Sequence, residues 1–150
     1  SQPSSLRGLW VLDLKTGQVL FTERVAHGKN TGNLEARHFS NEEGSNQSSL
    51  GLFRTAETYR GKHGYSLRLD GLEPGINDAA RDRAIVMHGA DYATGAFARK
   101  HGRLGRSWGC PALDPAISAD VIDTISGGTL LFAWHPAGEL VEESGFLGCE

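Results

Sequence analysis

Apolar residues fall into short runs along the chain, and polar, glycine-rich turns separate them. The runs 9–14 and 18–21 flank a Lys-Thr-Gly turn, which predicts a β-hairpin. Two further strands are predicted over 50–59 and 65–72, and in the second of these apolar and polar positions alternate. Residues 28–49 between them are mostly polar, so we expect a long loop, a feature that is often functional.

The second half of the chain predicts two more strands and one helix. Residues 84–87 form an apolar run that leads into His88, and 129–134 predict a last, buried strand. The helix is expected to begin after Asp114, a capping acid followed by Pro115 at the first helical position. Four apolar residues then share one helical face: Ile117, Val121, Ile122 and Ile125. Without repeats or a linker, the pattern predicts one mainly β domain over residues 1–150.

Composition narrows the function classes. The chain has 150 residues, 39% of them hydrophobic, which is enough to bury a core. The net charge of −3 argues against a general nucleic-acid binder, and no apolar run approaches the roughly 18 residues of a membrane span. No metal-binding spacing such as C-x-x-C or H-E-x-x-H occurs, so we expect neither a metal nor another cofactor. The three tryptophans are interpreted as packing residues.

Histidine is the first candidate for chemistry. Four of the six histidines precede a glycine, namely His27, His63, His88 and His101. Only His88 ends an apolar strand, where a rigid element can orient a side chain, while the other three lie in polar surroundings. A structural, hydrogen-bonded histidine is the alternative interpretation of His88.

The second candidate is Cys110, at the end of a segment without acidic residues. Residues 92–113 contain no Asp or Glu but four closely spaced cations: Arg99, Lys100, Arg103 and Arg106. We interpret the segment as a basic, glycine-rich loop, in which nearby cations favour the reactive thiolate. Gly109 places no side chain beside the sulfur, so neighbouring backbone N–H groups could face an oxyanion. A cysteine that only packs in the core is the alternative.

Two rival motifs overlap this segment. Residues 105–109 fit G-x-S-x-G, but a serine-hydrolase elbow needs a helix directly afterwards and a later histidine. Here Pro111 follows closely and only His135 lies downstream. Residues 102–105 fit the G-x-x-G loop of KH modules, which the acidic net charge disfavours. We interpret both matches as accidental.

Together, His88-Gly89 and the later Ser107-Trp108-Gly109-Cys110 resemble the L,D-transpeptidase (YkuD-like) catalytic domain. Segments 48–53, 63–67 and 105–107 extend the resemblance, which is closest to the murein L,D-transpeptidase catalytic-domain family and spans about 27–135. It implies a β-sandwich with the helix after Asp114 packed against it. Trp108 replaces the histidine of the family motif, so the role of that imidazole is either absent or taken by His27 or His101.

The resemblance implies roles for individual residues. Cys110 is the nucleophile, His88 takes and returns its proton, and the backbone carbonyl of Gly89 orients the imidazole. Three backbone N–H groups are expected in the oxyanion hole: those of Trp108, Gly109 and Cys110. Four residues are expected to contact substrate: Arg106, Ser107, Tyr92 and His27. For Tyr92 packing is the alternative, and for Ser107 hydrogen bonding within its own turn.

The function implied is that of a cysteine-dependent L,D-transpeptidase, which transfers peptidoglycan stem peptides through a thioester in the periplasm or cell wall. A hydrolase on the same Cys–His site (an L,D-carboxypeptidase or endopeptidase) is one alternative. A catalytically silent peptidoglycan-binding module that uses its three tryptophans is another. Cys149 is expected to have no catalytic role.

Overall fold

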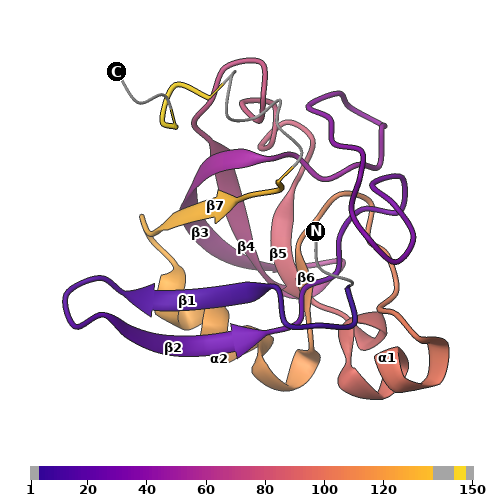
Figure 1. Ribbon diagram of the computed structural model, residues 1–150. Coiled ribbons are helices and arrows are strands. Elements are labelled where there is room, and N and C mark those ends of the chain that lie inside the picture. Colours follow the sequence, from indigo (N-terminus) through magenta and orange to yellow (C-terminus); the bar gives the residue numbers. More distant parts are fainter. Residues whose placement is uncertain (1–3, 137–143, 148–150) are drawn as a thin grey trace.

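The computed structural model describes residues 4–136 and 144–147, which form two β-sheets and two α-helices (Figure 1). A hairpin is made by β1 (Leu9–Asp13) and β2 (Gln18–Glu23). The larger sheet contains β3 (Gly51–Gly61), β4 (Gly64–Gly71), β5 (Val86–Gly89), β6 (Ala112–Leu113) and β7 (Leu130–Ala133). The helices are α1 (Gly95–His101) and α2 (Pro115–Ile125), and a 3-10 turn spans Asp91–Ala93.

The larger sheet has the order β6-β5-β4-β3-β7. Its strands pair antiparallel except for β5 and β6, which are parallel. In that parallel pair His88 lies opposite Ala112. The predicted hairpin and sheet strands are confirmed, and residues 29–49 contain no helix or strand.

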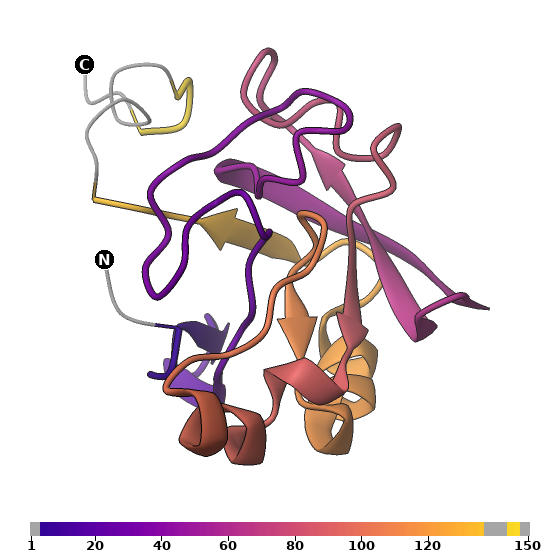
Figure 2. The ribbon, with the colours of Figure 1, turned by 90° about the vertical axis from the view of Figure 1, so that its right-hand side faces the viewer.

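The hairpin, the larger sheet and α2 share one hydrophobic core. Its buried members come from all three parts and include Val11, Phe53, Leu67, Leu69, Met87, Val121 and Ile122. A smaller cluster surrounds Leu104 and anchors α1. Both helices lie at the same end of the larger sheet (Figure 2). The predicted mainly β fold is therefore confirmed.

Helix α2 forms as its sequence predicts. The Asp114 carboxylate accepts a hydrogen bond of 3.0 Å from the backbone N–H of Ala116, and Pro115 occupies the first turn. Val121, Ile122 and Ile125 are buried against the sheet, and Ile117 is partly buried. A single local pattern thus determines both the start of the helix and the face that it buries.

Helix α1 lies where the sequence predicted a basic loop, so that part of the prediction was wrong. Thr94 caps the helix by accepting a hydrogen bond of 3.1 Å from the N–H of Phe97. Gly102, with φ of 72°, ends it in the left-handed region. The exposed side chains of Arg99 and Lys100 therefore project from a helix.

Two burial predictions were also wrong. Strand β7 is an edge strand, so Leu130 is 61% exposed and Phe132 43% exposed. The tryptophans expected to pack are each more than half exposed: Trp10 51%, Trp108 68% and Trp134 58%. Composition alone does not distinguish a packing tryptophan from a surface one.

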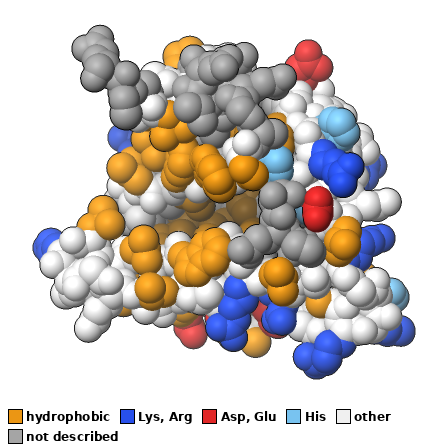
Figure 3. Space-filling model, in the orientation of Figure 1, with side chains coloured by type: hydrophobic (Ala, Val, Ile, Leu, Met, Phe, Trp, Pro, Cys, Tyr) orange, Lys and Arg blue, Asp and Glu red, His pale blue; other side chains and the backbone are white. Residues whose placement is uncertain are grey.

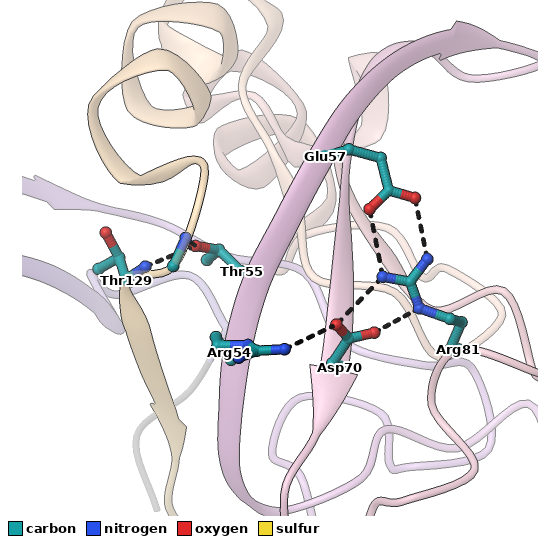
Figure 4. A network of polar contacts seen from close by, with 7 residues as sticks. Arg54, Thr55, Glu57, Asp70, Arg81 and Thr129 are labelled. Carbon is teal, nitrogen blue, oxygen red and sulfur yellow. Dashed lines mark hydrogen bonds and ion pairs between the residues drawn. The ribbon is translucent and has the colours of Figure 1, made fainter.

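An ion-pair network connects the β4–β5 segment to the sheet (Figure 4). The guanidinium of Arg81 donates to both carboxylate oxygens of Glu57, at 2.9 and 3.2 Å, and to the carboxylate of Asp70. Hydrogen bonds from Arg81 lower the pKa of Glu57 to about 2. Because this segment leads directly into β5, the network helps to hold the strand that carries His88.

Candidate active site

The fold brings two segments together at the β5–β6 pair. One is the end of β5, with His88 and Gly89, and the other is the turn of residues 107–110 that leads into β6. The backbone N–H of Val86 lies 3.5 Å from the Sγ atom of Cys110. The Sγ atom of Cys110 therefore lies beside the first residue of β5, the strand that carries His88.

The imidazole of His88 is held by its own strand. Its Nδ1 atom lies 2.9 Å from the carbonyl oxygen of Gly89. Because a carbonyl oxygen only accepts hydrogen bonds, Nδ1 carries the proton and Nε2 has the free lone pair. Gly89 has no room for a side chain, since a Cβ atom there would lie 2.7 Å from Oγ of Ser118 on α2.

A second histidine covers this ring. The imidazole of His63, in the β3–β4 turn, stacks on that of His88 with centroids 4.6 Å apart and planes at 23°. His88 is 2% exposed, and burial lowers the pKa of its imidazole, helped by the charge of His63. From the sequence, His63 was expected to lie in polar surroundings and was given no role in the site. The contact between His63 and His88 arises because β4 lies beside β5 in the sheet, an order that the sequence does not reveal.

The thiol of Cys110 is buried and free. Among the described residues its Sγ atom has two hydrogen-bond partners, the N–H of Val86 and the carbonyl of Ala84 at 3.8 Å. Burial raises the pKa of the thiol, while the Val86 N–H and the guanidinium of Arg83 act in the opposite direction. The prediction that neighbouring cations favour the thiolate was therefore wrong, because burial outweighs them. Cys149 lies outside the described residues.

Ser107 fastens the turn that carries Cys110. Its hydroxyl donates to the carbonyl of Cys110 at 2.6 Å and accepts from the N–H of Gly109 at 3.1 Å. The alternative of hydrogen bonding within the turn is thus confirmed for Ser107. Gly109 has φ of +120°, and a Cβ atom there would lie 2.8 Å from the carbonyl oxygen of Gln47.

These contacts distinguish between the three backbone N–H groups that were predicted to bind the oxyanion. The N–H of Gly109 is already bonded to Ser107. In the described part of the chain, no hydrogen bond occupies the backbone N–H of Trp108 or Cys110. Two of the three N–H groups thus have no hydrogen-bond partner among the described residues, and their role as oxyanion donors stays a prediction.

The side chains of Arg106 and His27 hold the long loop. Both reach the carbonyl oxygen of Gly32, Arg106 through Nε at 2.9 Å and His27 through Nε2 at 3.1 Å. The Nη1 atom of Arg106 also donates to the carbonyls of Leu104 and Gly105, at 2.7 and 2.8 Å. Burial lowers the pKa of Arg106 to about 10 and also lowers that of His27. Both residues thus have structural contacts, and their roles in substrate binding stay predictions.

Tyr92 packs beneath the same turn. Its backbone carbonyl accepts from the N–H of Gly105 at 2.8 Å, and it adjoins the buried cluster around Leu104. Burial raises the pKa of Tyr92 to about 12. These contacts favour the packing alternative for this residue.

Trp108 lies at the rim of the site between two lysines. The Nζ atoms of Lys29 and Lys62 lie 5.6 and 5.4 Å from the centroid of its indole ring. Neither lysine stands out in the sequence, because one belongs to the long loop and the other to the β3–β4 turn.

An apolar cavity of about 460 Å³ borders the cysteine turn on its other side. Figure 3 shows hydrophobic side chains gathered around this hollow. Gly109 and Pro111 form one wall, and the other walls come from the hairpin, the long loop and the larger sheet, β7 included. Its aromatic lining residues include Trp10, Phe39, Phe132 and Trp134.

Two other classes of site find no support in the geometry. Within residues 4–136 and 144–147, no cluster of His, Cys, Asp and Glu is placed to hold a metal ion. The serine-elbow match is not an elbow, because Ser107 is buried and β6, not a helix, follows. As for a membrane span, neither α1 nor α2 in the described chain has the length and apolarity to cross a bilayer.

A mainly β domain with an oriented histidine beside a cysteine turn is consistent with the resemblance noted in the sequence. The family model of the L,D-transpeptidase catalytic domain matches residues 1–134, and the chain belongs to that family. A solved structure of an L,D-transpeptidase from Mycobacterium smegmatis has a similar fold, with a TM-score of 0.51 at 16% sequence identity. The alignment covers 79% of this chain and 51% of that one, so the chain spans about half the length of this relative. Curated proteins give no significant match.

Proposed function

We propose that this chain is a cysteine-dependent L,D-transpeptidase that acts on peptidoglycan stem peptides in the periplasm or cell wall. The observation that carries the proposal is the orientation of His88 by the Gly89 carbonyl on β5, the strand whose Val86 N–H contacts Sγ of Cys110. That contact gives Nε2 the lone pair a general base needs. Membership of the L,D-transpeptidase family supports the substrate class.

In the proposed first step, Sγ of Cys110 attacks the carbonyl carbon of the bond between an L-centre and a D-residue. Nε2 of His88 takes the thiol proton and delivers it to the leaving amine, so the C–N bond breaks and a thioester forms. The N–H groups of Trp108 and Cys110 stabilise the oxyanion of the tetrahedral intermediate.

In the second step, the amine of another stem peptide attacks the thioester. His88 takes a proton from this amine and returns one to the departing sulfur, which restores the thiol. The product is a cross-linked or exchanged stem. If water attacks in place of the amine, the same site performs hydrolysis, so the choice of nucleophile separates the transferase from the hydrolase.

The proposal is tested with purified muropeptides and mass spectrometry, on wild-type protein and two cysteine variants. Cys110→Ala is expected to abolish product formation, whereas Cys149→Ser, the matched control, should retain full activity. A new amide product identifies the transpeptidase, and a trimmed stem alone identifies the hydrolase. A Cys110→Ala protein with full activity, or binding without turnover by the wild type, would overturn the proposal.

A further inference from the structure

The exposed indole of Trp108 brings two cationic side chains together. Trp108 is 68% exposed, and the ammonium groups of Lys29 and Lys62 both lie over its ring. Cation–π attraction favours each contact, but it also places two like charges near one another. Within the described chain neither lysine belongs to an ion pair. The pair therefore lacks an anion among the described side chains.

Both lysines are connected to the elements of the proposed active site. The backbone N–H of Lys29 donates to the carbonyl of Ser107 at 2.8 Å, which joins the long loop to the cysteine turn. Lys62 directly precedes His63, whose ring stacks on His88. Trp108 itself lies two residues before Cys110. Lys29 is thus connected to the turn that carries Cys110, and Lys62 to the histidine that stacks on His88.

Arg106, the cation first expected to bind substrate, donates most of its hydrogen bonds to the protein itself. Its Nε and Nη1 atoms donate to backbone carbonyls, and its Nη2 atom is buried without a hydrogen-bond partner among the described residues. Arg99 and Lys100 belong to the last turn of α1 and not to the cysteine turn. By contrast, the ammonium groups of the two lysines at Trp108 donate no hydrogen bond to any described residue.

We propose that Lys29, Lys62 and Trp108 form a subsite for a free carboxylate of the acyl-donor stem peptide. The carboxylate bridges the two ammonium groups and so relieves their repulsion, and the indole face packs against the aliphatic part of the same residue. This inference rests on the proposed function, because it takes the stem peptide as the ligand.

The test separates binding from turnover by using Cys110→Ala protein and isothermal titration calorimetry. The ligands are a synthetic tetrapeptide stem with free side-chain carboxylates and the same stem with these groups amidated. We expect the double variant Lys29→Gln/Lys62→Gln to raise the Kd of the free stem about tenfold. Lys62→Arg, which keeps the charge, should retain affinity. The amidated stem should bind all variants alike. Lys15→Gln, an exposed lysine of the β1–β2 turn, is the matched control.

The outcomes distinguish this subsite from the catalytic proposal. If Kd for the free stem is unchanged in the double lysine variant, or the stem does not bind at all, the subsite is wrong. If Lys100→Gln alone weakens binding, the carboxylate site belongs to α1 and the inference is overturned. If carboxylate-dependent binding holds while the wild type gives no muropeptide product, the subsite stands and the transpeptidase proposal fails.

Discussion

The hydroxyl of Ser107 offers a sharp test of how the cysteine turn is held. Ser107 is 4% exposed, and its Oγ atom bonds the carbonyl of Cys110 and the N–H of Gly109. Ser107→Ala removes both bonds without leaving a large cavity. The variant therefore isolates the hydrogen bonds from packing.

The expected loss follows from the two backbone groups left without a partner. An unsatisfied buried donor or acceptor costs about 1–3 kcal/mol. Because Trp108 within the turn is 68% exposed, water can replace part of the lost bonding, and we expect the free energy of unfolding to fall by about 2–4 kcal/mol. The turn also positions Sγ of Cys110, so turnover should fall roughly tenfold to a hundredfold.

Urea denaturation measures the first effect and muropeptide turnover the second. Ser118→Ala is the matched control, because Ser118 is also buried but its hydroxyl makes no hydrogen bond within the described residues. Alanine favours the helix there, so its unfolding free energy should stay within about 0.5 kcal/mol of wild type. A Ser107→Ala protein that matches Ser118→Ala in stability and retains full turnover would refute the reasoning.

Three further predictions concern the proposed base, the proposed nucleophile and a buried amide. His88→Ala should lower kcat/KM about 10²–10⁴-fold. In the wild type, kcat/KM should decrease on acidification only below pH 6.5, because the neutral ring is the base and burial lowers the pKa of His88. A pH–rate profile with its acid limb above that value would contradict this. By resemblance to the L,D-transpeptidase family, a carbapenem should acylate Cys110 and add its mass once, as peptide mapping would show. Labelling only at Cys149 would contradict the assignment of the nucleophile. Asn77→Ala should lower the unfolding free energy by about 3–5 kcal/mol in urea, because its fully buried amide bonds three backbone groups at 2.9, 2.9 and 3.0 Å; a loss below about 1 kcal/mol would show that these bonds are replaced.

Local signals made much of the fold predictable. The cap at Asp114 and the apolar face that follows it are contained within one helix, and the alternation in residues 65–72 is contained within one strand. The signals for α1 were equally local, with Thr94 at its start and Gly102 at its end. They were missed because the density of basic and glycine residues was taken as a sign of a loop.

The site was predictable only in part, because its remaining contacts join distant segments. His88 ends a strand and so could be singled out from the sequence, whereas its neighbour His63 reaches it through strand order. Lys29 and Lys62 meet at Trp108 from two loops separated by β3. Burial of Cys110 also depends on packing between segments, so a count of nearby cations gave the wrong direction for the pKa of its thiol.

The two pKa shifts together constrain how the proposed nucleophile is activated. Burial raises the pKa of Cys110 and lowers that of His88, so both shifts favour the neutral forms. Between the pKa of His88 and that of Cys110, the two side chains are therefore a neutral imidazole and a thiol, not an imidazolium and a thiolate. The thiol donates to the carbonyl of Ala84 in this state, so it must leave that contact to reach Nε2 of His88. In the proposed mechanism, proton transfer then accompanies attack on the substrate, and Nε2, which the Gly89 carbonyl keeps unprotonated, accepts the proton.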